Sequence, residues 1–173
     1  MTLRLMQEQG FSRMSIDAVA AEAGVGKPTI YRRWTSKEDL ATAALEQLRV
    51  DEPPLTGTTA LERLKAVLLN FRRSLLRPNG MALIGMVLAE EQHTPELLRL
   101  FRERVVAPRR AIVAAAVEDA IRRRELQPDA DAEAITTMLI GSIYARYLAG
   151  QPIPPAWVDR IVSQLPRNGL TLV

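Results

Sequence analysis

The sequence contains no cysteine and a single histidine among its 173 residues. The lack of cysteine excludes a disulfide framework, a thiolate metal site and a cysteine nucleophile. The one histidine, His93, follows Glu90 in the Glu-x-x-His order used by di-iron helical bundles, but such sites need two of these motifs. We therefore interpret His93 as a surface residue and expect no metal site.

Long apolar runs are also missing. No stretch approaches the ~18 consecutive apolar residues of a membrane-spanning helix, and the first residues do not resemble a secretion signal. The sequence has no phosphate-binding glycine loop and no supported Ser/His/Asp arrangement, so we expect no enzymatic activity and no cofactor. With 47% hydrophobic residues, the chain has enough apolar material for a core, and we expect a soluble, cytoplasmic protein.

Apolar residues recur with helical spacing and no segment alternates with period two for long, so the sequence predicts an all-α fold. The stretch 51–57, DEPPLTG, cannot be helical throughout, and we interpret it as a joint between two domains, residues 1–50 and 51–173. Pro108 is expected to kink or break a helix. The spacing predicts helices over about 37–50, 58–77, 81–91, 95–107, 109–124, 132–149 and 155–165.

The segment 15–40, SIDAVAAEAGVGKPTIYRRWTSKEDL, has the outline of a helix-turn-helix. A Gly-Val-Gly turn separates two short helices, and Pro28 lies in the first turn of the second, where a missing N–H costs nothing. Ile30 and Trp34 are four residues apart, so they share one helix face and are expected to pack inward with Val25. The opposite face of this helix is left for a partner.

That outward face has the chemistry of the DNA major groove. Pro28 and Tyr31 are able to contact a thymine methyl group, and the hydroxyl and cationic side chains suit phosphates and guanine edges. From Ala23 to Lys37 there are four cations and no acid. A basic run of this size also occurs as a solvated helix face, but the spacing of the turn, the proline and the inward pair favours nucleic-acid binding.

The motif AGVGKPTIYRRWTSKEDL resembles the DNA-binding domain of TetR-type transcriptional regulators, in which a recognition helix is followed by a Ser-Lys-Glu-x-Leu helix start. The resemblance covers about residues 10–48. It implies base or nearby phosphate contacts for one group of residues, Lys27, Pro28, Thr29, Tyr31 and Arg32. It implies DNA-backbone contacts for a second group, Ser15, Arg33 and Lys37. Lys37 also follows Ser36, the expected N-cap of the next helix, whose free N–H groups favour an anion.

Two positions depart from the family pattern. Gly26 stands where many members have a capping serine, which should weaken the helix cap by only a few tenths of a kcal/mol. Only MTLRLMQEQ precedes Gly10, so we expect a shortened first helix without the basic arm that often enters a DNA groove.

The helix expected over 132–149 is apolar on two sides, and the core of one protomer can cover only one of them. One side carries Ile135, Met138, Leu139 and Ile143, and the other carries Ile140, Tyr144 and Tyr147. A row of small residues, Thr137, Gly141 and Ala145, would let a second helix come close. With the last helix, we predict a dimer interface containing Ile140, Gly141, Tyr144, Ala145, Trp157 and Ile161. Burial within one subunit is the alternative.

A dimer also suits a helix-turn-helix, because two-fold symmetry lets two recognition helices read a palindrome. The resemblance implies the same, since TetR-type members dimerise through their last two long helices. The C-terminal part resembles, more loosely, one subset of TetR-type ligand-binding domains, which implies a small-molecule pocket among the middle helices. Soft or aromatic candidates for its lining are Phe71, Met81, Met86, Phe101 and Met138. For any one of them, the pattern favours an ordinary core residue.

The sequence therefore predicts a dimeric, TetR-like DNA-binding transcriptional regulator, of the repressor type. Its predicted partners are a palindromic double-stranded operator, a second copy of itself and an unknown small-molecule effector that releases it from DNA. The alternative is a helical small-molecule-binding or protein-interaction module that has lost DNA binding, an interpretation favoured by the missing basic arm. Salt dependence separates the two, since only a DNA binder should lose affinity for duplex DNA steeply as salt rises.

Overall fold

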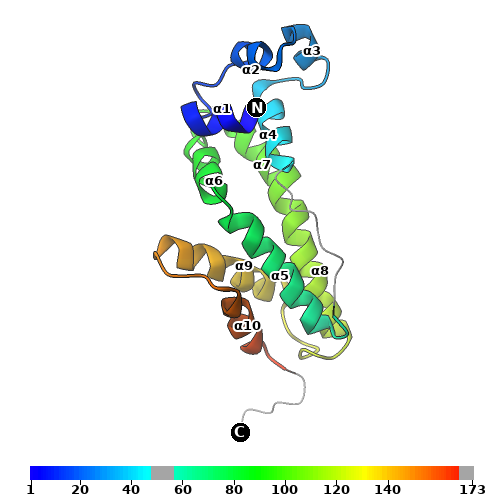
Figure 1. The fold of residues 1–173 in the computed structure, drawn as a ribbon. Coiled ribbons are helices and arrows are strands. Elements are labelled where there is room, and N and C mark those ends of the chain that lie inside the picture. Colours follow the sequence, from blue (N-terminus) through cyan, green and yellow to red (C-terminus); the bar gives the residue numbers. More distant parts are fainter. Residues whose placement is uncertain (48–56, 168–173) are drawn as a thin grey trace. The chain divides into compact units, whose positions relative to one another are not determined.

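A computed structural model describes residues 1–47 and 57–167 of the chain. In these residues the elements are ten α-helices and one π-helical turn, without a strand, so the predicted all-α fold is confirmed (Figure 1). The chain divides into two compact units, residues 1–49 with 74–108 and residues 50–73 with 109–173. These units differ from the predicted domains, because residues 74–108 group with the N-terminal helices. Residues 51–56 of the predicted joint lie outside the described residues.

The first unit begins with four short helices, α1 (Thr2–Gln9), α2 (Ile16–Ala23), α3 (Lys27–Tyr31) and α4 (Lys37–Glu46). Their starts follow from local sequence. The Ser15 hydroxyl accepts a hydrogen bond from the N–H of Ala18 at 3.1 Å, and the Ser36 hydroxyl accepts one from the N–H of Asp39 at 3.0 Å. Such side-chain oxygens satisfy N–H groups that a helix start leaves without partners. Residues 48–50 of the predicted fourth helix lie outside the described residues.

Helices α6 (Gly80–Ala89) and α7 (Pro95–Phe101) complete the first unit. They share one hydrophobic core with the N-terminal helices. The buried core residues from α6, α7 and the turn that follows are Leu83, Val87, Leu97, Leu98, Phe101 and Val105. The helix-turn-helix therefore rests on apolar side chains that lie far from it in sequence.

Pro108 was predicted to kink or break a helix, and the structure contains no break there. A π-helical turn, η1 (Arg102–Val106), follows α7 directly and leads into α8 (Ala107–Arg122), so the chain stays helical through the proline. A proline has no N–H to donate, and its ring collides with the carbonyl four residues earlier in a regular α-helix. The wider π turn lies immediately before Pro108 and accommodates the ring without ending the helix.

The second unit contains most of α5 (Ala60–Leu76) and α8, with α9 (Ala132–Leu148) and α10 (Pro155–Ser163). The Asp131 carboxylate caps α9, accepting a hydrogen bond from the N–H of Ala134 at 3.0 Å. The unit has its own core, to which all four helices contribute through Leu64, Leu68, Val113, Val117, Ile135, Leu139, Val158 and Val162.

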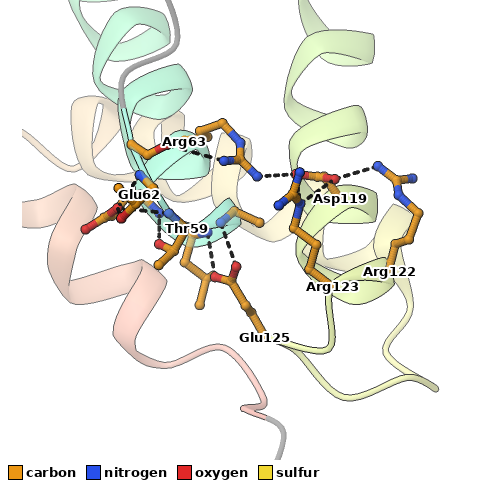
Figure 2. Close-up of polar contacts among 11 residues, drawn as sticks. Thr59, Glu62, Arg63, Asp119, Arg122, Arg123 and Glu125 are labelled. Carbon is orange, nitrogen blue, oxygen red and sulfur yellow. Dashed lines mark hydrogen bonds and ion pairs between the residues drawn. The ribbon is translucent and has the colours of Figure 1, made fainter.

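The start of α5 is capped by two glutamates (Figure 2). The Glu62 carboxylate accepts the N–H groups of Thr58 at 2.8 Å and Thr59 at 3.0 Å. Glu125, just beyond α8, accepts the N–H groups of Ala60 at 2.7 Å and Leu61 at 3.0 Å. The first N–H groups of a helix have no partner within the helix, so these two carboxylates satisfy donors that would otherwise be left unpaired.

Beside this cap, the Asp119 carboxylate gathers three arginines (Figure 2). It lies 2.6 Å from the guanidinium of Arg63, 2.6 Å from that of Arg122 and 3.0 Å from that of Arg123. The hydrogen bond from Arg63, followed by those from Arg122 and Arg123, holds the pKa of Asp119 far below its usual range. Arg122 and Arg123, near the end of α8, are thus paired with an acid of the same helix.

Candidate nucleic-acid interface

The recognition helix α3 presents one face to the core and one to solvent. Ile30 is buried in the core of the first unit and Trp34 packs partly buried against it, as predicted. Val25, predicted to join them, is instead 40% exposed. It follows Gly24, whose φ of 65° ends α2, and the turn leaves the Val25 side chain outside the core.

The solvent face of α3 carries most of the residues predicted to contact bases. Lys27, Pro28 and Arg32 are exposed, Thr29 is half-buried, and Tyr31 is 52% exposed, which is unusual for a side chain of its size. Within the described residues, Arg32 makes no ion pair. This face therefore presents an aromatic ring, a proline and cations that are exposed to solvent.

The residues predicted to contact the DNA backbone flank this face. The Arg33 guanidinium lies 5.4 Å from the centre of the Trp34 ring. The Lys37 ammonium lies 4.3 Å from the centre of the Phe11 ring and donates a hydrogen bond to the Ser12 carbonyl at 3.2 Å. Lys37 thus joins the start of α4 to the turn before α2, and its remaining N–H donors are left for a phosphate.

Two polar groups next to the interface make contacts that the sequence does not indicate. Glu90 at the end of α6 is buried, and its carboxylate accepts hydrogen bonds from the hydroxyls of Ser12 and, at 3.1 Å, Thr94. The residues next to Glu90 in the sequence include no Lys or Arg that would indicate a partner for its carboxylate. His93, three residues further on, is exposed, so its predicted surface position is confirmed.

The second group centres on Arg104 in the π-helical turn η1. Its guanidinium lies 2.6 Å from Asp39 and 2.6 Å from Glu46, both on α4. Asp39 also accepts the N–H of Thr35 at 2.8 Å. The hydrogen bond from Thr35, followed by that from Arg104, lowers the pKa of Asp39. Asp39 therefore connects the residues just after α3 to the turn η1.

The five predicted pocket residues are divided between the two units. Met81, Met86 and Phe101 belong to the first, where Phe101 is part of the core and Met86 packs against it. Phe71 and Met138 belong to the second. Phe71 meets Tyr144 edge-on at a ring-centre distance of 6.4 Å, whereas Met138 is 60% exposed.

The predicted dimer residues lie on α9 and α10. Ile140 and Ile161 pack partly buried against the core of the second unit, and Ala145 is exposed. The Arg146 guanidinium lies 4.2 Å from the centre of the Trp157 ring. An exposed stripe, spaced three and four residues apart along α9, consists of Met138, Gly141, Ala145 and Leu148, with Gly141 partly covered and Leu148 82% exposed.

Among the described residues, no helix is long and apolar enough to cross a membrane, and no group of three His, Cys, Asp or Glu side chains lies close enough together to hold a metal ion.

Comparison with known proteins matches both parts of the chain to one family. Residues 1–44 match the family described as Bacterial regulatory proteins, tetR family, and residues 53–165 match the family described as Tetracyclin repressor-like, C-terminal domain. An HTH-type transcriptional regulator of Mycobacterium tuberculosis is 35% identical over 175 residues, which cover 98% of this chain and 84% of that protein. The DNA-binding transcriptional repressor TetR of Mycobacteroides abscessus is 27% identical over 166 residues, covering 94% and 86%.

Solved structures show the same similarity. The TetR family transcription regulator SCO0332 superposes with a TM-score of 0.68 at 26% identity, covering 94% of this chain and 90% of that one. The regulator FadR from Bacillus subtilis, solved in complex with stearoyl-CoA, superposes with a TM-score of 0.69 at 19% identity, covering 94% and 92%. At that identity, the second likeness concerns the fold alone.

Proposed function

Because the chain belongs to the TetR family of DNA-binding bacterial transcriptional regulators, we propose that it represses transcription as a homodimer bound to a palindromic operator. The observation that carries the proposal is the uncovered face of α3, where an exposed tyrosine, a proline and cations stand on a helix of the size that enters a major groove. Because operator DNA lies in the cytoplasm of a bacterium, we propose that the protein acts there. We assign it no catalytic activity.

Each residue of the interface receives a role from its chemistry and position. Pro28 and Tyr31 provide apolar contact for a thymine methyl group. Arg32 provides two parallel N–H donors for a guanine edge or a phosphate. Lys27 and Thr29 stand at the leading end of α3, within reach of a base or the adjacent phosphate. Phosphates on either side would bind Arg33, Lys37 and the start of α2 at Ser15.

The dimer is proposed to form through α9 and α10, with the exposed stripe Met138, Gly141, Ala145 and Leu148 at its centre. A large apolar side chain that is mostly exposed in one chain, such as Leu148, gains by burial against a second copy. A Cβ built on Gly141 meets nothing within 4 Å, so a partner helix is able to approach the α9 backbone there. The exposure of Met138 suits this interface better than an enclosed pocket.

We further propose release of the operator by a small apolar or amphipathic effector. The regulator FadR, which shares the fold, was solved in complex with stearoyl-CoA, a ligand of that class. Within the second unit, Phe71 is an apolar candidate for contact with such a ligand. The effector would act by favouring a spacing of the two recognition helices that no longer matches successive major grooves, ~34 Å apart.

The proposal is tested by selecting binders from a randomised pool of short duplex DNA at two salt concentrations. The wild-type dimer should enrich one palindrome, and Tyr31→Ala should not. Leu88→Ala is a matched control, since Leu88 is an exposed apolar side chain of the first unit on α6, outside the helix-turn-helix. A folded wild-type dimer that enriches no sequence would refute operator binding and favour the alternative of a module without DNA recognition.

A further inference from the structure

The leading residue of the recognition helix is paired with an acid. The Lys27 ammonium lies 2.5 Å from the Asp17 carboxylate, which belongs to the first turn of α2. Both side chains are open to solvent, with 54% of Lys27 and 65% of Asp17 exposed. The pair therefore stands on the surface that DNA would meet, and the family resemblance assigned no role to Asp17.

This pairing is selective among the cations of the segment 23–37. In the part of the chain that the structure describes, Lys27 is the one cation of the four that forms an ion pair with a carboxylate. Arg33 lies over the Trp34 ring and Lys37 lies beside Phe11, which leaves both charges uncompensated. Asp17 thus reduces the positive charge at one place, the tip of α3.

We propose that Asp17 is a specificity-determining residue, which lowers the affinity for random DNA more than the affinity for the operator. The inference rests on the proposed operator binding. Affinity for random DNA comes almost entirely from cations that neutralise phosphates, so a lysine shared with a carboxylate contributes less to it.

Operator binding is affected less, because it uses hydrogen bonds as well as charge. An ammonium has three N–H donors, of which one is sufficient for Asp17. The other two remain able to donate to the guanine O6 and N7 atoms in the major groove. Asp17 also fixes the direction of the long Lys27 side chain, which reduces the entropy that a base contact would cost. The ion pair therefore weakens the contact of Lys27 with phosphates, while a contact with a base remains possible.

The test compares the wild type with Asp17→Asn, which keeps the shape and removes the charge. Dissociation constants are measured for the selected palindrome and for a random duplex of equal length, at 50 and 200 mM salt. The variant should bind the random duplex roughly fivefold more tightly at the lower salt, with the operator changing by less than about twofold. The random-duplex salt slope should steepen by about 0.9, the value of one additional phosphate contact.

Three further variants isolate the cause. Glu96→Gln changes the net charge equally on α7, where the exposed Glu96 pairs with Arg99 at 2.7 Å, and should leave the ratio of the two affinities unchanged. Asp17→Glu keeps the charge and should keep the wild-type ratio. In a Lys27→Met background, Asp17→Asn should produce a smaller gain on random DNA, because the ion pair is already absent. Thermal unfolding of each variant checks that α2 remains folded.

The outcomes separate this inference from the function it rests on. A wild type that selects no palindrome would refute the proposed function, and the specificity role with it. A wild type that selects a palindrome, with Asp17→Asn shifting both affinities equally or neither, would refute the role of Asp17 alone. If Asp17→Asn unfolds the protein, Asp17→Glu and Lys27→Met still decide, since loss of the wild-type affinity ratio in the charge-retaining variant contradicts the proposal.

Discussion

Glu125 satisfies the start of a helix more than sixty residues away in sequence, and its removal should be measurable. Its two carboxylate oxygens accept the N–H groups of Ala60 at 2.7 Å and Leu61 at 3.0 Å (Figure 2). Both residues are buried. In Glu125→Ala, these donors would lose their partner in a place where water replaces it poorly.

The expected cost follows from the number of donors. An unsatisfied buried N–H costs about 1–3 kcal/mol, so with two donors Glu125→Ala should lower the free energy of unfolding of the second unit by about 2–6 kcal/mol. Glu125→Gln retains one acceptor oxygen and should cost about half as much. Glu118→Ala, at an exposed position on α8, is the matched control and should change stability by less than about 0.5 kcal/mol.

Urea unfolding followed by tryptophan fluorescence measures this change. The chain has two tryptophans, Trp34 in the first unit and Trp157 in the second. A Trp34→Phe background therefore makes fluorescence report the second unit alone. Equal unfolding midpoints for Glu125→Ala and Glu118→Ala, with unchanged slopes, would refute the assignment of Glu125 as the cap of α5.

Two further predictions concern the first unit and the dimer. Arg104→Met should lower the free energy of unfolding of the first unit by about 1–2 kcal/mol at pH 7. This is less than the cost of losing a fully buried ion pair, because Arg104 is partly exposed. The pKa of Asp39 is lower in the folded protein than its unfolded value of about 3.9, so its ionised form stabilises the fold above that pH and this contribution is lost as the pH falls. The difference in free energy of unfolding between Arg104→Met and the wild type should therefore be smaller at pH 3 than at pH 7. Urea unfolding followed by Trp34 fluorescence measures this difference. Leu148→Glu should yield monomers in sedimentation analysis. The control Val106→Glu, at an exposed position in the turn η1, should remain dimeric. An interface at α9 would be contradicted if both variants were dimeric.

Helix starts were the most predictable feature, because their chemistry is local. A serine or aspartate three residues before a free N–H acts within one turn, so Ser15, Ser36 and Asp131 could be assigned as caps without knowledge of the fold. The core face of α3 was predictable for the same reason, since Ile30 and Trp34 are one helical turn apart. The exposure of Val25 was not, because it depends on the direction in which the turn after Gly24 leaves the core.

Features that depend on distant contacts could not be read from the sequence. Glu125 caps a helix that starts 65 residues earlier, and Glu90 accepts a hydrogen bond from Ser12, 78 residues away. The fate of Pro108 was equally hidden. A proline inside a helical pattern predicts a break, but a π turn before it costs less when the flanking segments are both held by their cores.

The core of the first unit contains residues from both sides of the predicted joint. Composition places a joint at residues 51–57, and the recognition motif lies entirely before it. The core beneath the motif nevertheless includes Leu97, Leu98 and Val105, so the N-terminal helices bury their apolar faces against α6, α7 and η1 rather than against one another alone. The ion pairs of Arg104 with α4 add to the same contact. Asp39, which binds both Arg104 and the N–H of Thr35, therefore connects the turn η1 to the residues that follow the recognition helix.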